Sequence, residues 1–176
     1  MAKRRAAEAE AERILRETGR AGDVPIDVEA VAEYLGAQVI RERLDRDVSG
    51  LLLRDADSVM IGVNDLHAPR RQRFTVAHEV AHLVLHKGRP LVLDHVRLNF
   101  RDATSSAATD AEEIEANQFA AAILMPADLV ISEARRLLED AAATDASIVP
   151  LLAQGFDVSD QAMEYRLINL GLRRQV

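Results

Sequence analysis

Cysteine is absent from this chain of 176 residues, so disulfide bonds and thiolate metal sites are excluded. Long apolar stretches are also absent, because no run approaches the about 20 residues that a membrane-spanning helix needs. Residues 1–13 carry basic side chains but no hydrophobic segment of the kind found in a secretory signal. These absences predict a cytoplasmic protein that makes no membrane contact.

Positive charge is in short supply: 22 Lys and Arg stand against 29 Asp and Glu, which gives a net charge of −7. Since phosphate contacts supply most non-specific affinity for nucleic acid, an acidic chain is a poor candidate for direct DNA binding. Two small basic clusters, Lys3–Arg5 and Arg70 with Arg71 and Arg73, are interpreted as solvated helix ends. No direct contact with nucleic acid is therefore expected.

Hydrophobic residues make up 48% and charged residues 29% of the chain, which suits a soluble domain with a core of its own. Apolar periodicity and turn residues predict an α+β fold in which a small sheet lies against a helical body. The predicted strands are 37–43, a hairpin of 51–53 with 59–63, and short extended segments at 91–93 and 96–100. The predicted helices are 4–17, 28–35, 69–86, 109–125, 127–139, 145–154 and 159–170.

Three of the five histidines, His78, His82 and His86, lie four residues apart in an otherwise apolar helix. The first two enclose an HExxH motif. Residues four apart share one helix face at about 6 Å, so both imidazoles can bind one metal ion. Glu79 lies about 100° round the helix, where it can accept a proton from a water that the ion makes more acidic. Because a buried imidazole pair is costly without partners, metal ligation explains the motif better than a hydrogen-bonded core pair with an incidental glutamate.

A catalytic zinc ion needs a third protein ligand and an open position for water. The candidates are His86, Asp94, His95 and the acids of the helix predicted at 109–125. His86 is unsuitable, because residues at i, i+4 and i+8 span about 12 Å of helix axis. It is expected instead to cap the helix end or to pack against the sheet.

Three acids of that helix could supply the ligand: Glu112, Glu113 and Glu115. Helical spacing groups Glu113 with Asn117, which would turn Glu113 inward and let Asn117 form a hydrogen bond to a neighbouring ligand. Glu112 is expected in a capping box with Thr109, and Glu115 is expected in solvent. Glu113 is therefore the preferred third ligand, with the other two acids as alternatives.

The segments RFTVAHEVAHLVLH and EIEANQFAAAILMP together resemble the ImmA/IrrE family of zinc metallopeptidases. The family pattern joins an AHExxHxxxH helix to a helix of the form ExxANxFAxxxxMP. The likeness extends to FDVSDQAMEYRLINLGL and covers about residues 24–172. It implies a zincin-like fold, with a small, mainly antiparallel sheet packed on helices that include the HExxH helix. We accordingly divide the chain into an N-terminal extension at 1–20, a metallopeptidase core at 21–130, and C-terminal helices of the same unit at 131–176.

The resemblance implies one zinc ion bound by His78, His82 and Glu113, with Glu79 as general base. It also implies an endopeptidase that cleaves, or antagonises, a helix-turn-helix repressor encoded by a neighbouring gene, in transcription regulation or the stress response. One alternative is an antirepressor that sequesters the repressor uncut, although a pure binding module has no use for Glu79. Another is a DNA-binding regulator with its recognition helix within 158–171, which the acidic charge disfavours.

Overall fold

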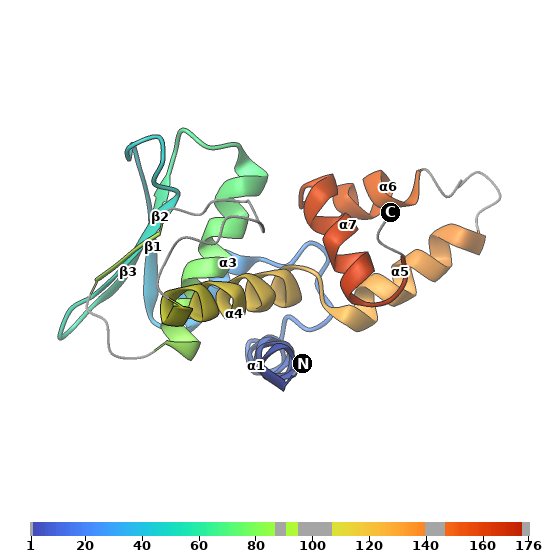
Figure 1. The fold of residues 1–176 in the computed structure, drawn as a ribbon, viewed down its shortest axis with the longest axis horizontal. Coiled ribbons are helices and arrows are strands. Elements are labelled where there is room, and N and C mark those ends of the chain that lie inside the picture. Colours follow the sequence, from blue (N-terminus) through green and yellow to red (C-terminus); the bar gives the residue numbers. More distant parts are fainter. Residues whose placement is uncertain (1, 87–90, 95–106, 140–146, 174–176) are drawn as a thin grey trace.

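The computed structural model describes residues 2–86, 91–94, 107–139 and 147–173, and the side chains of 5–86, 91–92, 111–139 and 147–173. Figure 1 shows the sheet at one end, α3 and α4 in the middle, and α5 to α7 at the other end. The elements are α1 (Ala2–Glu17), α2 (Val28–Tyr34), β1 (Ala37–Glu42), β2 (Gly50–Arg54), β3 (Val59–Asn64), α3 (Pro69–Leu85), β4 (Leu91–Asp94), α4 (Ala107–Leu124), α5 (Ala127–Glu139), α6 (Ile148–Gly155) and α7 (Asp160–Asn169).

The sheet has the strand order β1-β3-β2-β4. β2 and β3 form the predicted hairpin, and β2 also pairs antiparallel with β4. β1 pairs with β3 in parallel, so the sheet is mixed and two of its three pairings are antiparallel. The expected α+β class with a small sheet is confirmed. The extended segment predicted at 96–100 lies outside the described residues.

The core lies between the sheet and the helices. Leu52, Ile61 and Val63 point from the sheet toward α3, and every residue from Phe74 to His82 of α3 is buried. A helix that is buried on all sides must pack against other elements on every side. α3 does so, because it packs against the sheet, α2 and α4.

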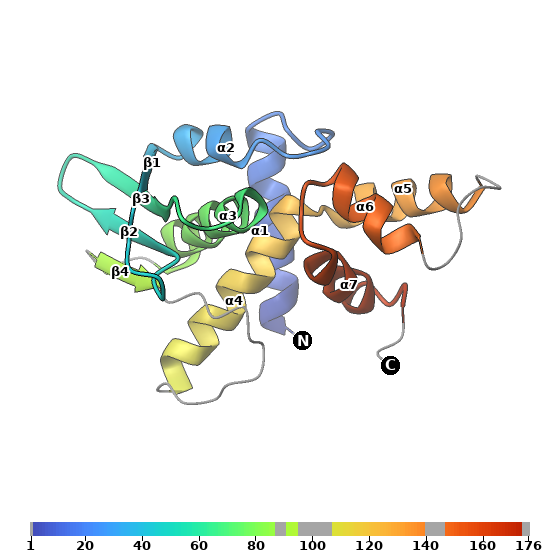
Figure 2. The ribbon, with the colours of Figure 1, turned by 90° about the horizontal axis from the view of Figure 1, so that it is seen from above.

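α1 lies along α4 in the view of Figure 2 and contributes to the same core. Its apolar residues follow helical spacing, and Ala7, Ala11, Ile14 and Leu15 are buried. The division of the chain at residue 20 stays a prediction, but the apolar face of α1 is already covered by the rest of the fold.

Two sequence interpretations are wrong. The cluster around Arg71 is not a solvated helix end: Arg71 donates to Ser49 Oγ at 2.8 Å, and Arg73 donates to the Ile26 carbonyl at 2.9 Å. Arg73 also pairs with Asp157 at 3.2 Å, which ties α3 to the loop before α7. In addition, α4 begins at Ala107, so Thr109 is not its N-cap and no capping box starts there.

Among the residues that the structure describes, no single helix meets the length and apolarity that crossing a membrane requires. α4 from Ala111 and α5 meet that criterion only as a pair, and the pair is bent by 51°. Ala116, Phe119 and Ile123 of α4 belong to the buried core.

Candidate metal centre

Two helices bring three potential metal ligands together. α3 supplies His78 and His82, whose Nε2 atoms are 3.0 Å apart, and α4 supplies Glu113. The Glu113 oxygens lie 3.2 Å from His78 Nε2 and 3.4 Å from His82 Nε2. One donor atom from each of the three residues falls within 4.8 Å of the others, a spacing that can hold a metal ion. Both imidazoles are buried, and the Glu113 side chain is one-third exposed.

Charge at the centre favours a cation. Burial by itself would raise the pKa of the Glu113 carboxyl, but hydrogen bonds and charges from His78 and His82 outweigh burial and hold that pKa well below its usual range. Glu113 is therefore ionised at neutral pH, and an ionised carboxylate is the form that binds a metal ion.

Asn117 orients His78. Its Oδ1 lies 3.1 Å from His78 Nδ1, which makes Nδ1 the protonated nitrogen of that ring. Nε2 then faces Glu113 and His82, and a metal ion bound there would replace the proton that Nε2 shares with the carboxylate. The sequence predicted this hydrogen bond from the position of Asn117, one helical turn after Glu113, and the prediction is confirmed.

His82 has a corresponding partner in His86. The two Nδ1 atoms are 3.0 Å apart, and His86 Nε2 lies 3.5 Å from Glu115 Oε2. If His82 donates from Nδ1 to His86, then His86 carries its own proton on Nε2, toward the carboxylate of Glu115. In this series of contacts Nε2 of His82 is the ring nitrogen that faces Glu113, at 3.4 Å.

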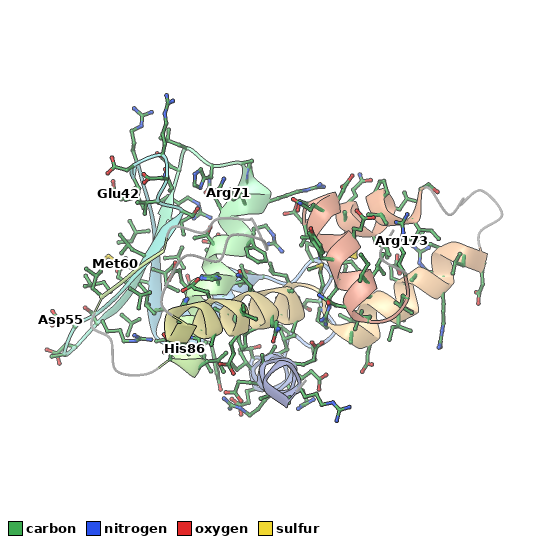
Figure 3. All side chains as sticks on the ribbon, viewed as in Figure 1. Glu42, Asp55, Met60, Arg71, His86 and Arg173 are labelled. Atoms are coloured by element: carbon green, nitrogen blue, oxygen red, sulfur yellow. The ribbon has the colours of Figure 1, made fainter. Side chains whose placement is uncertain are left out.

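The role of His86 was thus only partly predicted from the sequence. It is the C-cap of α3, as expected, but its side chain lies against His82 and α4, near the end of α3 in Figure 3. The expectation that Glu115 would be solvated is wrong, since only 20% of its side chain is exposed. The spacing of four between His82 and His86 was the available signal for this contact.

Arg54, at the end of β2, is a second residue that the sequence did not single out. Its Nη2 donates to the carbonyls of His82 at 2.5 Å and His86 at 3.2 Å. A cation at this place satisfies the last carbonyls of α3 and favourably meets the helix dipole. Burial lowers the pKa of Arg54, and the charge of Glu79 partly offsets that effect.

Glu79 is fully buried and lies against the first residue of β2. A Cβ atom added to Gly50 would stand 2.9 Å from Glu79 Oε1. The carboxylate therefore reaches the backbone of the sheet at a point where only glycine leaves room for it.

Comparison with known proteins was made on sequence and on structure. The profile of the IrrE N-terminal-like domain, peptidase family M78, matches residues 32–168. The chain belongs to this family. A comparison with curated protein sequences found no match.

The IrrE-like fold is also found among solved structures. A Mycobacterium tuberculosis transcriptional regulator superimposes with a TM-score of 0.62 at 19% sequence identity. The match covers 93% of the present chain and 46% of the regulator, so the chain spans less than half the length of that protein. At this identity the likeness shows a shared fold.

The residues of this IrrE-like domain fit the metal that a peptidase family implies. Two neutral imidazole nitrogens and one carboxylate form the donor set of many zinc sites that keep a position open. Glu113 is the acid of α4 that meets both histidines, and His86 is outside the group, as its spacing predicted. The remaining candidates, the side chain of Asp94 and all of His95, lie outside the described residues.

Proposed function

We propose that the protein is a zinc-dependent endopeptidase, in which His78, His82 and Glu113 hold one zinc ion and Glu79 is the general base. The observation that carries the proposal is the meeting of three donor atoms within 4.8 Å on two packed helices, and the buried Glu79 follows His78 in one of them. Membership of a peptidase family supports the same reading.

Each residue of the centre has a chemical task under this proposal. A zinc ion bound there would act as a Lewis acid toward the carbonyl of the scissile bond and the attacking water. Glu79 would accept a proton from that water on a carboxylate oxygen and deliver it to the leaving nitrogen. Burial keeps solvent from screening the Glu79 charge, which strengthens its effect on a nearby proton. Asn117 and His86 would hold the two imidazoles in the tautomer that binds metal.

The proposed substrate is a helix-turn-helix repressor encoded by a neighbouring gene, whose cleavage would release the genes it controls. This part rests on the ImmA/IrrE resemblance of the two motif-bearing helices, α3 and α4. The solved relative is named a transcriptional regulator, and a role in transcription control is part of the proposal for the present chain. A cytoplasmic location follows from such a substrate.

The test is a digestion. The full-length chain, loaded with zinc, is mixed with the helix-turn-helix repressor encoded nearest its gene, and mass spectrometry searches for a new terminus. Glu79→Gln is run alongside, because the amide keeps the size of the side chain but cannot accept the proton. We expect a discrete cut by the native chain and a loss of at least about a hundredfold in rate for Glu79→Gln.

The matched control is Glu164→Gln on α7, where the side chain is half exposed and remote from the centre. It should cut at the native rate, and both variants should bind one equivalent of zinc. Full activity of Glu79→Gln would show that the base is assigned wrongly. No cut by any variant, together with a stable complex, would favour an antirepressor that sequesters the repressor without hydrolysis.

A further inference from the structure

A cavity lies between α4 and α7, beside the proposed metal centre. Its empty space is about 540 Å³, including a part that opens to solvent. Because the cavity is partly open to solvent, a side chain of a bound peptide can enter it. The lining residues are Phe74 from α3; Asn117, Gln118, Ala121 and Met125 from α4 and its end; and Ser159, Gln161, Ala162, Tyr165, Arg166 and Asn169 from α7 and its cap.

The cavity begins one helical turn from the metal centre. Asn117 forms part of its wall and also holds His78 at 3.1 Å. Glu113 precedes Asn117 by four residues on α4, a separation of about 6 Å along one face. A peptide whose scissile bond lies at Glu113 and the histidines is therefore close enough to place an adjacent side chain in this space.

The residues that line the cavity disfavour the binding of a charged side chain. Phe74, Ala121, Met125 and Ala162 present carbon atoms, and none of the described residues that line the cavity is acidic. Arg166, the one cation among the described lining residues, is 3% exposed, donates to the Met125 carbonyl at 2.8 Å and is paired with Glu8. A charged side chain would lose its hydration there without gaining a free counter-ion, whereas an apolar side chain gains by leaving water.

We propose that this cavity binds an uncharged, apolar side chain, such as that of Leu, Met or Phe, next to the bond that is cut. The inference rests on the proposed peptidase function and adds the substrate class. The neutral amides of Gln118 and Gln161 can supply donors and acceptors for the peptide backbone on either side of that side chain. Because half of the wall comes from α7, the C-terminal helices take part in selecting the substrate.

The first test measures binding without catalysis. The full-length protein, with its methionine methyl groups labelled with ¹³C, is titrated with N-acetyl-leucinamide, N-acetyl-phenylalaninamide and, as the charged probe, the singly charged N-acetyl-aspartic acid amide. Met125 reports on the cavity. Met60, which lies on the sheet face turned away from the helices in Figure 3, is the internal control. We expect saturable shifts of the Met125 methyl signal with the two apolar probes alone and no shift at Met60.

Two variants test whether the shift of the Met125 signal comes from binding in the cavity. Ala121→Leu fills the space and should weaken binding of both apolar probes by about tenfold or more. Ala134→Leu makes the same change at a partly buried alanine of α5 that is not part of the wall, and it should bind like the native chain. An absent Met125 response, or equal binding by the two variants, would overturn the inference.

The second test measures selection during cleavage. The zinc-loaded chain digests a library of peptides prepared from a proteome, and the residues on each side of every cut are counted. The native chain and Ala134→Leu should favour apolar residues at one position beside the cut, and Ala121→Leu should lose that preference. Cuts without any preference would contradict the inference while leaving the peptidase function intact. Apolar probes that bind at Met125 with no cut in any peptide would instead count against the peptidase function.

Discussion

Gly50 and Glu79 show how one residue without a side chain can determine where a buried carboxylate lies. A Cβ at position 50 would lie 2.4 Å from Thr75 Cγ2 and 2.9 Å from Glu79 Oε1. Both distances are shorter than van der Waals contact allows, and the carboxylate is the mobile end of a flexible side chain. Glycine at the start of β2 is therefore required for the present position of the proposed base.

The prediction concerns the double variant Gly50→Ala with Thr75→Ser. Serine keeps the hydroxyl that donates to the Arg71 carbonyl but removes Cγ2. The new methyl group then has two close contacts, Glu79 Oε1 at 2.9 Å and the Gly62 carbonyl at 3.0 Å, and the carboxylate is the one that can move. We expect zinc binding to be unchanged and kcat to fall by about tenfold or more, because the base has moved relative to the water.

Thr75→Ser alone is the control and should keep the native kcat, with circular dichroism checking that both variants fold. The assignment of Gly50 as a positioning residue fails if the double variant is as active as this control. Loss of zinc from the double variant would equally count against it, since that would indicate a change at the histidines.

Only part of the site could be predicted from the sequence, because some of its residues are related within one helix and others are in contact across different elements. His78, His82, Glu113 and Asn117 are related by spacing within single helices, and the period of a helix is readable in the sequence. The contacts of His86 with Glu115, of Arg54 with the end of α3, and of Gly50 with Glu79 join different elements. They depend on how those elements pack, which no local pattern contains.

Elements were predicted well where a period or a turn signal was strong. The hairpin of β2 and β3 follows from two apolar runs around a turn, and α7 follows from Ser159 and the apolar spacing after it. The parallel pairing of β1 with β3 was not predicted, because the sequence of a strand does not show which other strand it pairs with, or in which direction. The start of α4 was placed two residues late, since Thr109 and Glu112 imitate a capping box inside a helix.

The cap of α7 gives a prediction at this scale. Ser159 accepts a hydrogen bond from the Ala162 amide at 3.1 Å, as its sequence position indicated. Ser159→Ala should lower the free energy of unfolding by about 1 kcal/mol, because that amide loses its acceptor at the helix end. Ser159→Asp retains an acceptor and should stay near native. Urea unfolding of the three proteins measures the difference, and equal midpoints for all three would show that the cap contributes nothing.

The whole molecule is held together by contacts between distant parts of the chain. Arg166 of α7 pairs with Glu8 of α1, 158 residues away, and donates to the Met125 carbonyl at the end of α4. Arg73 of α3 reaches both Asp157 and the Ile26 carbonyl. From the sequence, Arg73 was interpreted as part of a solvated helix end, and Arg166 lies in the segment 158–171 that was weighed as a recognition helix. Each is instead part of the packing that brings α7 to the cavity beside the metal centre.

Metal binding should stabilise this assembly as a unit. The proposed ligands come from α3 and α4, and α4 packs on α1, so the donor set exists only while these helices are in contact. The unfolded chain has no cysteine to compete for zinc. A ligand that binds the folded state alone stabilises it by about 4 kcal/mol when its concentration is about a thousand times its Kd.

We therefore expect zinc to raise Tm by several degrees in calorimetry and a chelator to reverse the rise. Glu113→Gln should lose most of the zinc-dependent increase, because the amide cannot supply the negative charge that the ion needs. Glu112→Gln, one residue earlier on the same helix, should keep it. An equal response of the two variants would mean that Glu113 is not the third ligand, whereas no response of the native chain would mean that the three residues do not hold zinc at all.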